Sequence, residues 1–532
     1  MRPPGADLHS PVVTNSIVSR TRGAEVAGAP RSQDTAGTDD GRQDRGHAVV
    51  TGGGITGLAA ALLLADDGWR VTLVERDEEP QAETPDEAFE SWRRKGIVQV
   101  RHSHAFLGRL RNFLRDRQPA LLADLLAAGA RELRLLDVPP RGLRGLVPEP
   151  GDDDLVMLGC RRITFEWVLR RHVLSRPGVT LLPGATVSGL GFVPGDPPRV
   201  TGVRVSRDGV ESMISADVVV DASGRSSQAP RWIEEIGART PREEIEPSSL
   251  VYYSRFYRLR PGAEEPTPGT YPGAADYNWI KYAIFPSDAR TFSITLASPL
   301  AYPEMKVVAQ ARAFDEVTRA IPALAAWTDP ERAEPIGDPE RPVQAMSGLV
   351  NRLRRFVDER GPVALGFFAL GDAAYCTNPL YGRGCAQGFL HADMLARALA
   401  SHPGDLDAAA RELDASARRD IEPFFRASLL ADRDATSKAE GRRPSRWRAR
   451  LAKRFFEDGV VVATRCDPVV FRAFVRMMNM LETPERAFGD RRVLLRSLRV
   501  WMRGKRRNAA FGVPPPPDKD ALVERCRRAL AA

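Results

Sequence analysis

The sequence predicts an α/β protein in which a parallel sheet is interrupted by an inserted antiparallel sheet and is followed by a C-terminal helical region. Three observations support this fold class. A strand, a glycine-rich turn, a helix and a second strand follow one another within residues 49–75. Apolar and polar residues alternate in three runs between Leu250 and Leu300, as they do in half-buried strands. Beyond Gly384 the apolar residues recur at helical spacing.

The chain is 532 residues long, which leaves room for two or three domains and a large core. Residues 1–47 contain few large apolar side chains and many Gly, Ser, Thr, Asp and Arg, a composition typical of disorder. This segment lacks the apolar stretch of a signal peptide, and its Arg and Ser residues leave transit or processing as the alternative. We therefore expect a disordered segment (1–46), a nucleotide-binding domain with helical and β-meander insertions (47–240), a mainly antiparallel substrate domain (241–355), a return to the nucleotide-binding domain with a long helix (356–435) and a helical region (436–532).

Composition excludes several classes of protein. No apolar run reaches the length of a membrane span. The five cysteines show no C-x-x-C spacing, which argues against a zinc site or a disulfide framework and favours a reduced, cytoplasmic protein without a bound metal. The formal net charge is +8, and the basic residues are concentrated late in the chain. Such an excess suits nucleic acid, acidic lipid headgroups or an anionic cofactor. We attribute it instead to genome composition, and we expect no nucleic-acid partner and at most peripheral membrane contact.

The segment with the strongest functional signal is the glycine-rich turn. Gly52, Gly54 and Gly57 form G-x-G-x-x-G at the exit of a strand and at the start of a helix. The first glycine turns the chain, the second lets the backbone approach a pyrophosphate, and the third lets the helix pack on the sheet. Glu75 ends the second strand, where an acid accepts the ribose hydroxyls and disfavours a 2′-phosphate. Together these residues predict a dinucleotide site, with a plain strand–helix–strand turn as the alternative. They do not choose FAD over NAD.

Elements in the middle of the chain carry a second group of signals. We expect a helix over Leu107–Leu126 that Pro119 splits, an amphipathic helix over Arg162–Leu174, and a three-stranded β-meander over Thr186–Phe192, Arg199–Arg207 and Ser212–Val220. The last run ends in D-A-S-G-R-S-S, so a strand delivers Asp221 and a glycine turn at its tip. His102 and His104 stand two positions apart, so in an extended segment they face the same side. The two histidines then either line one pocket together or have a purely structural role.

A further strand, Phe367–Leu370, ends at Gly371 and presents Asp372 at its tip. A loop rich in Pro and Gly follows it and opens a long helix near Gly384. A role for Asp372 as a turn residue alone is the alternative.

The C-terminal region is predicted to be helical. One helix carries Val469, Phe471, Phe474, Val475 and Met478 on one side, and the next carries Val493, Leu494, Leu498 and Trp501. Basic residues interleave with these apolar positions, which is typical of the solvated faces of a helical cap.

Four of these separated segments match one pattern. The chain resembles the FAD-dependent aromatic hydroxylase superfamily, the group A-type flavoprotein monooxygenases, and looks closest to the branch of squalene-epoxidase-like and polyether epoxidases. That branch typically carries G-V-P-Q-x-x-H-x-H, S-R-x-x-x-E-W and D-A-x-G-R-x-S. The matching segments here are Gly96–His104, Arg162–Trp167 and Asp221–Ser227, and the likeness extends from Val49 to about Leu399. The resemblance implies an FAD-binding Rossmann-like domain of the glutathione-reductase type.

The resemblance also implies a flavin site. In it Asp372 accepts from the ribityl hydroxyls or orients the pyrophosphate, and the turn Gly382–Gly384 places a helix N-terminus at the flavin pyrimidine ring. The positive end of that helix favours the anion that reduced flavin carries near N1. The predicted cofactor-binding residues are Gly52, Gly54, Gly57, Glu75, Arg76, Arg94, Arg162, Asp221, Gly371, Asp372, Pro379, Gly382 and Gly384. Asp221 as a turn cap remains the alternative for that residue. No catalytic residue is assigned, and His102 and His104 are the candidates.

The activity that the resemblance implies is oxygenation of a mainly apolar small molecule, such as a polyketide or isoprenoid intermediate of secondary metabolism. Reduced FAD reacts with O₂, and a C4a-hydroperoxyflavin delivers one oxygen atom by epoxidation or hydroxylation. NAD(P)H is the expected electron donor. Since Asp-Ala-Ser-Gly replaces the Asp-Gly turn of single-component hydroxylases, the electrons arrive either directly or through a separate flavin reductase. The chain contains no W-x-W-x-I-P segment of flavin-dependent halogenases.

Two alternatives stay open at this point. One is an FAD-dependent reductase or dehydrogenase of the geranylgeranyl-reductase type, which shares the nucleotide fold. The other is a non-catalytic, flavin-containing protein that uses its basic tail to bind a membrane or a nucleic acid.

Overall fold

The computed structural model describes residues 45–97, 99–267, 269, 271–442, 446–512 and 514–531. The prediction of disorder over residues 1–46 lies, up to residue 44, outside the described residues.

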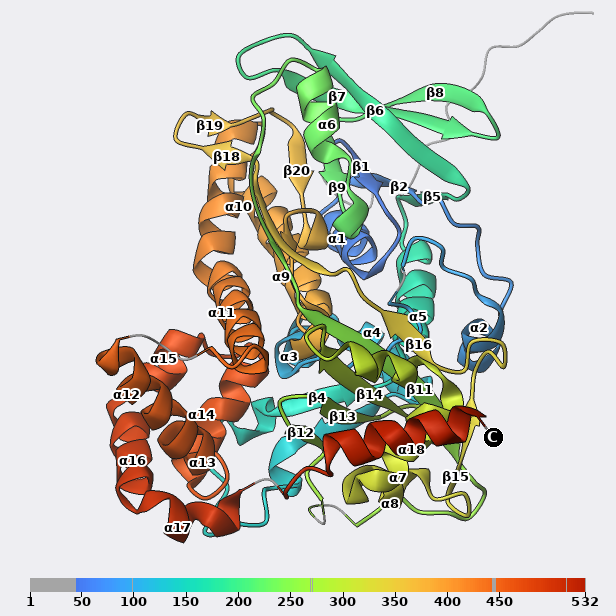
Figure 1. Cartoon of the computed structure of the whole chain (residues 1–532). Helices are drawn as coiled ribbons and strands as arrows, with labels where there is room; N and C mark the ends of the chain where they lie inside the picture. The colour runs from blue at the N-terminus through green and yellow to red at the C-terminus, as the bar shows by residue number, and fades with distance from the viewer. Residues whose placement is uncertain are drawn as a thin grey trace, which may run out of the picture. The chain divides into compact units, whose positions relative to one another are not determined.

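A five-stranded parallel sheet forms the centre of the nucleotide-binding part, with strand order β20-β9-β1-β2-β5. Its strands are β1 (His47–Thr51), β2 (Arg70–Val74), β5 (Val179–Leu182), β9 (Val218–Asp221) and β20 (Phe367–Ala369). The valines of β1 and β9 are fully buried because helices cover the sheet, as parallel sheets require. Helix α1 (Ile55–Asp66) connects β1 to β2 and packs against α9 (Gly384–Ser401) (Figure 1). The predicted strand–turn–helix–strand unit is confirmed.

A separate three-stranded antiparallel sheet contains β6 (Ala185–Val193), β7 (Arg199–Arg207) and β8 (Val210–Ser215). The predicted third run, Ser212–Val220, was wrong in one respect. Its first half pairs with β7, whereas its second half forms β9 and joins the parallel sheet beside β1. The break falls between Ser215 and Val218, where the fully buried Val-Val-Val stretch begins.

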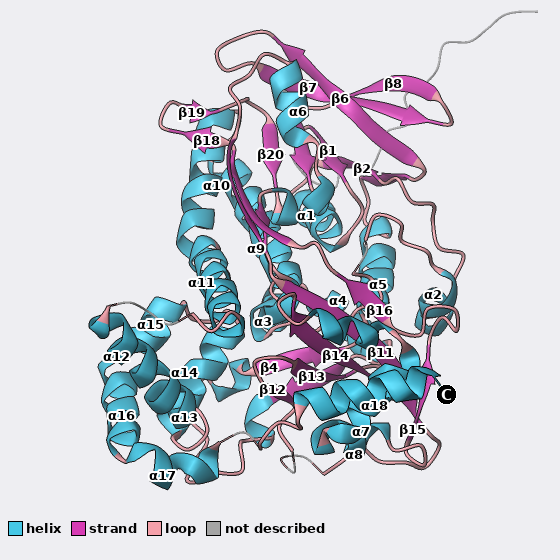
Figure 2. Ribbon diagram, viewed as in Figure 1, coloured by secondary structure: helices cyan, strands magenta, loops and turns pink. Residues whose placement is uncertain are grey.

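The predicted antiparallel sheet of the substrate side is confirmed as a six-stranded sheet (Figure 2). Its strands are β11 (Leu250–Leu259), β12 (Ala274–Asp276), β13 (Lys281–Pro286), β14 (Thr291–Pro299), β15 (Ala333–Ile336) and β16 (Gln344–Met346). Helices α7 (Ala311–Ala320), α8 (Pro322–Thr328) and α18 (Lys519–Ala531) share an apolar core with it. The last helix of the chain therefore packs mainly against α7 and shares the apolar core of the inserted region.

Helices between β2 and β5 close the sides of the nucleotide-binding part. They are α2 (Pro85–Ser91), α3 (Gly108–Arg117), α4 (Pro119–Ala127) and α5 (Arg162–Leu174). The predicted break at Pro119 is confirmed, since Pro119 begins α4. The remaining short elements are β3 (Arg131–Arg134), β4 (Val156–Gly159), α6 (Ala229–Glu235), β10 (Arg242–Pro247), β17 (Val350–Arg355), β18 (Val357–Asp358), β19 (Gly361–Pro362) and β21 (Tyr375–Cys376).

After α9 the described residues are mainly helical up to Asn508. The helices are α10 (Leu406–Asp420), α11 (Glu422–Ala439), α12 (Trp447–Phe455), α13 (Val461–Ala463), α14 (Pro468–Met478), α15 (Pro484–Gly489), α16 (Arg491–Met502) and α17 (Gly504–Asn508), with a π-helical turn at Phe456–Val460. The predicted packed side of α16 needs correction: Val493 is buried, but Leu494 and Leu498 are exposed. No helix among the described residues has the length and apolar character that crossing a bilayer requires.

Candidate functional site

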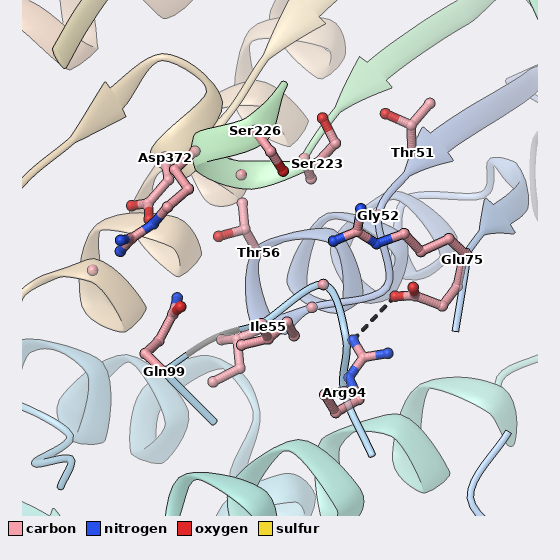
Figure 3. A pocket seen from close by; sticks show the side chains of 18 of the residues that line it. Thr51, Gly52, Ile55, Thr56, Glu75, Arg94, Gln99, Ser223, Ser226 and Asp372 are labelled. Atoms are coloured by element: carbon pink, nitrogen blue, oxygen red, sulfur yellow. Dashed lines mark hydrogen bonds and ion pairs between the residues drawn. The ribbon is translucent and has the colours of Figure 1, made fainter. Parts of the chain in front are cut away.

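A cavity of about 270 Å³ opens at the carboxyl ends of the parallel strands, where ligands bind in open α/β sheets. Its lining comes from segments that lie far apart in the sequence: residues 51–56, 74–76, 94–104, 162, 185–187, 222–232 and 372–385. Figure 3 shows the Glu75–Arg94 pair at one end of this cavity and Asp372 at the other, with Ile55 and Thr56 between them. The arrangement is elongated, as a dinucleotide requires.

Two of the three glycines of the turn, Gly52 and Gly57, are required by steric contacts within the protein. Gly52 has φ +98°, and a Cβ there would lie 2.6 Å from the carbonyl oxygen of Ala222. A Cβ on Gly57 would lie 1.8 Å from the carbonyl oxygen of Gly52, so only glycine lets α1 approach the turn. Gly54 differs, because a Cβ there would meet only Ile97, at 3.4 Å. Gly54 lines the cavity and caps α1 without a side-chain hydrogen bond. The N–H groups of the first turn of α1 therefore remain available to an anion.

Glu75 lines the cavity at the end of β2 and is held by hydrogen bonds within the protein. Its carboxylate accepts from the backbone N–H of Gly53 at 2.8 Å and of Asp77 at 2.9 Å, and from the Arg94 guanidinium at 3.0 Å. Burial by itself would raise the pKa of Glu75. The positive charge of Arg94 and these hydrogen bonds outweigh burial, so the pKa of Glu75 is lowered. The carboxylate is thus anionic and fixed where a ribose would reach it.

Arg94 borders the cavity, but its hydrogen bonds go to protein acids and not to open space. Its side chain is fully buried and pairs with Glu75, with Asp77 at 3.1 Å and with Glu166 at 2.8 Å. It also donates to the carbonyl oxygen of Gly53 at 3.0 Å. Arg94 therefore compensates three buried carboxylates and ties the glycine turn to α5.

Arg162, at the first position of α5, and His104 meet in the cavity wall. Arg162 donates to Nε2 of His104 at 3.3 Å and contacts Glu166 at 3.4 Å, while its Nε is buried without a partner among the described residues. Nδ1 of His104 donates to the carbonyl oxygen of His102 at 2.9 Å, since Nε2 accepts from Arg162. Burial and the Arg162 charge lower the pKa of His104 to about 3. His104 is therefore neutral and serves as an acceptor.

His102 does not line the cavity with His104. The chain turns at Gln99–His102 instead of running extended, so His102 points toward the antiparallel sheet and bonds Ser254 of β11 at 3.0 Å. Ser254 bonds Thr295 of β14 at 2.8 Å, and Thr295 bonds Ser103 at 2.8 Å. Ser103 lines the cavity. Burial lowers the pKa of His102 to about 4, so it too is neutral at physiological pH.

Asp221 lies behind the cavity wall. It is fully buried, and its carboxylate accepts from the hydroxyls of Thr51 at 3.1 Å and Ser227 at 2.5 Å and from the backbone N–H of Ser223 at 3.0 Å. These contacts match the alternative of a turn cap. The D-A-S-G-R-S-S turn lines the cavity with residues 222–226, and Nε of Arg225 is buried and unpartnered within the described part of the chain.

Asp372 faces the cavity from the tip of the turn after β20. Its carboxylate accepts no hydrogen bond from the described residues, and burial raises its pKa despite the charges of Arg225 and Arg162. Gly371 lies behind it with φ +56°, where a Cβ would lie 2.6 Å from the Thr56 hydroxyl of α1. The Gly371 N–H donates to Nδ1 of buried His391 at 3.2 Å. Asp372 is therefore held in place through its backbone, with its carboxylate left for a ligand.

The loop Pro379–Gly384 ends the cavity and opens α9. Pro379, Gly382 and Gly384 line the cavity, and a Cβ on Gly384 would meet only Asp372, at 3.8 Å. Asn378 holds this loop from below: it caps Leu380 N–H at 3.1 Å and donates to Asp432 of α11 at 2.8 Å. The helix start thus points a second set of backbone donors at the same cavity.

Ten of the thirteen predicted cofactor residues line the cavity, and Gly57, Asp221 and Gly371 stand behind its wall. Sequence reasoning did not single out Gln99, Ser103, Arg225 and Thr377, which line it too. Gln99, Ser103 and Arg225 lie inside quoted motifs, so their motif positions were the available signal. Among the described residues no cluster of three His, Cys, Asp or Glu side chains is placed to hold a metal ion.

The residues present fit FAD. Two helix N-termini, an anionic acid at the ribose end and an unpaired carboxylate at the ribityl end meet in one elongated cavity. The buried, unpartnered Nε atoms of Arg162 and Arg225 are cationic donors that a phosphate or a flavin carbonyl would satisfy.

Comparisons with known proteins agree with this geometry. The protein-family profile described as FAD dependent oxidoreductase matches residues 47–136. Protein Rv3254 from Mycobacterium tuberculosis is 28% identical over 489 residues, which cover 86% of this chain and 95% of that protein.

Solved structures share the fold. PqsL from Pseudomonas aeruginosa, a probable FAD-dependent monooxygenase, has a TM-score of 0.53 and 20% identity, over 74% of this chain and 96% of its own. OxyS anhydrotetracycline hydroxylase from Streptomyces rimosus has a TM-score of 0.52 and 18% identity, over 82% of this chain and 76% of its own. The flavin-dependent halogenase CmlS has a TM-score of 0.53 and 17% identity, over 92% of this chain and 77% of its own. The predicted fold class is confirmed, and the closer likeness to squalene-epoxidase-like enzymes stays a prediction.

Proposed function

We propose that this chain is an FAD-dependent monooxygenase that transfers one oxygen atom from O₂ to a mainly apolar small molecule. The observation that carries the proposal is the convergence of Glu75, the α1 N-terminus, Asp372 and the α9 N-terminus on one cavity. The FAD dependent oxidoreductase profile and the fold shared with flavin-dependent hydroxylases and halogenases support it.

Each part of the cavity has an assigned contact. Glu75 accepts from the adenosine ribose, and the α1 N-terminus at Gly54 and Ile55 binds the pyrophosphate. Asp372 takes the ribityl hydroxyls, and the loop ending at Gly384 lies against the pyrimidine side of the flavin. The flavin, when bound, supplies the activation of O₂ and the transfer of one oxygen atom.

The chain's own contribution is positioning and electrostatics. The α9 N-terminus, Arg162 and Arg225 place positive charge around the predicted ring position, which stabilises negative charge on a reduced cofactor. His104 is neutral, and its Nε2 already accepts from Arg162. We therefore assign His104 the role of orienting Arg162 and not that of a proton donor.

The substrate is expected on the side of the antiparallel sheet. The hydroxyls of Ser103, Thr295 and Ser254 form a bonded row there, between the cavity and His102. PqsL has been solved with 2-aminobenzoylacetate, and OxyS is an anhydrotetracycline hydroxylase, so both act on or bind small organic molecules. Epoxidation is the reaction that the squalene-epoxidase-like motifs favour. NAD(P)H is the proposed electron source, directly or through a separate flavin reductase.

The test begins with the absorption spectrum of the purified protein, with FAD added if it is colourless. Reduction is then followed with NADH, with NADPH, and with a flavin reductase present. Incubation under ¹⁸O₂ with apolar unsaturated and aromatic compounds should yield products that carry one labelled oxygen. A saturated, unlabelled product would establish the reductase alternative. A protein that takes up no FAD would overturn the proposal.

A further inference from the structure

The outer sides of α12 and α16 expose large apolar side chains, in contrast to the packed face that the sequence predicted. Trp447 is 63% exposed, Leu495 66% and Met502 69%. The apolar residues exposed on these two helices are Trp447, Leu451, Leu494, Leu495, Leu498 and Met502. We name this set the α12–α16 patch. Isolated exposed apolar residues are ordinary, but a set gathered on two neighbouring helices marks an interaction surface.

The two helices bring these side chains together. On α12, Trp447, Leu451 and Phe455 recur at spacing i, i+4, and on α16 Leu494, Leu498 and Met502 do the same. The rings of Phe455 and Trp501 meet at 5.8 Å, edge to face, so α12 contacts α16 through residues that lie beside the exposed side chains. The ion pair Lys505–Asp458, at 3.2 Å, also joins α17, which follows α16, to the π-helical turn that continues α12. Figure 1 shows α12 and α16 as neighbours at one edge of the C-terminal helices.

Cations surround the patch. Residues 446–507 contain seventeen Lys or Arg and six Asp or Glu, so this segment carries more positive charge than the whole chain, whose net charge is +8. Arg448, Arg450, Arg499 and Arg503 are exposed, and within the described ranges no ion pair involves them. Arginines at the border of an apolar surface extend their guanidinium groups to its rim.

We propose that the α12–α16 patch docks the protein on the surface of a lipid bilayer that contains anionic lipids. Apolar side chains with Trp on one face and Lys or Arg beside them are the composition of helices that lie in a membrane interface. The anionic headgroups complement the arginines, and the acyl region takes up the leucines. A nucleic acid would pair with the arginines but would leave Leu495 and Met502 in water. This surface does not depend on the proposed enzymatic function, because none of its residues lines the cavity.

The test is flotation of the purified full chain with vesicles of phosphatidylcholine, either alone or with phosphatidylglycerol. We expect the protein to float with the anionic vesicles only and to dissociate at high salt. The variant Leu495→Ser with Met502→Ser should lower this binding by about tenfold or more, because each loses a buried aliphatic group from the interface. The matched control is Val210→Ser with Met213→Ser on β8, where 69% and 54% of the side chains are exposed, and it should float like the unmodified protein.

A charge variant and a spectroscopic readout make the test independent of any one substitution. Arg499→Gln with Arg503→Gln should weaken binding and flatten its dependence on salt. Trp447 fluorescence should shift to shorter wavelength with anionic vesicles, and Trp447→Phe should remove the shift. The proposal is overturned if the protein ignores anionic vesicles, if the β8 control loses binding equally, or if the patch variant instead abolishes a dimer of the chain.

Discussion

Replacement of Arg94 by Met is the sharpest test of how the ribose end of the cavity is built. Arg94 is fully buried and neutralises three carboxylates, Glu75, Asp77 and Glu166, which are themselves almost fully buried. Met keeps the apolar stem and removes the charge together with the hydrogen bonds. The change therefore leaves the three carboxylates without their counter-charge in a low-dielectric site.

We expect Arg94→Met to lower the free energy of unfolding by about 3–5 kcal/mol. This is the cost of removing one partner of a buried ion pair, because the other charge stays buried and uncompensated. Arg93 provides the matched control next to it. Its side chain is 63% exposed and reaches Asp338 only at 3.4 Å. A surface pair of this kind contributes below about 1 kcal/mol, so Arg93→Met should leave the free energy of unfolding almost unchanged.

The pH dependence has a definite sign. In the unmodified protein the pKa of Glu75 lies below its ordinary value of 4.5, so the stability it contributes is present above that pH and is lost on further acidification. Without Arg94, burial instead raises the pKa of Glu75. As the pH falls, protonation of the unpaired carboxylate removes part of the penalty in the Arg94→Met variant. The difference in the free energy of unfolding between the two proteins should therefore shrink from about pH 8 to about pH 5.

The assay is urea unfolding of both proteins at several pH values with excess FAD, together with FAD retention on gel filtration. We expect Arg94→Met to lose cofactor as well as stability, since Glu75 and the carbonyl of Gly53 lose their shared donor. A loss below about 1 kcal/mol, or an equal loss for Arg93→Met, would refute the reasoning.

Three further predictions concern other parts of the site. Gly54→Ala should leave the unfolding of the cofactor-free protein unchanged, because the Cβ meets only Ile97, yet weaken FAD binding more than about tenfold, as titration of the flavin fluorescence will show. Burial lowers the pKa of His391 to about 4 in the folded protein. Between about pH 6.5 and 4 the histidine is therefore protonated in the unfolded chain but neutral in the folded protein, so the free energy of unfolding falls as the pH drops through this range. His391→Gln should therefore reduce the loss of stability between about pH 7.5 and 5 by about 2 kcal/mol. Asp432→Leu leaves the buried side-chain amides of Asn351 and Asn378 without their acceptor. It should lower the free energy of unfolding by about 2–4 kcal/mol and speed FAD release. The control Asp434→Leu, on the solvent side of the same helix, should do neither.

The fold and the ends of the cavity were accessible from sequence because local physics specifies them. Gly57 is required by its contact with the nearby carbonyl oxygen of Gly52, Gly52 has the positive φ of a tight turn, and Glu75 follows at the spacing of the strand–helix–strand unit. The break at Pro119 and the strand that ends before Asp372 were equally local. Such elements are predicted well because the pattern and the steric reason belong to the same stretch of chain.

What the sequence did not disclose depends on tertiary contacts. Arg94 was predicted to bind the cofactor, but Glu166 and Asp77 reach it from other elements and accept its hydrogen bonds. His102 and His104 were expected to share a face, but the turn Gln99–His102 directs His102 to Ser254, whereas His104 meets Arg162. On α16, Val493 and Leu494 are adjacent and both apolar, and only the position of neighbouring helices decides that the first is buried and the second exposed.

The loop at the flavin end shows how far such dependence extends. Asn378 begins it, and the N-P dipeptide marked a turn without indicating what holds that turn. In the structure Asn378 joins Tyr252 of β11, Ser248 and Asp432 of α11, while Asn351 of β17 bonds both Asn378 and Asp432. The inserted sheet and the C-terminal helices therefore meet at one buried acid directly beneath the cofactor loop. Burial raises the pKa of Asp432, while hydrogen bonds from Asn351, Asn378 and Ser248 favour its ionised form, and a shift of either domain would be transmitted to the loop through these bonds. The position of the α9 N-terminus is thus set jointly by all three parts of the chain, which is why no single motif was able to predict it.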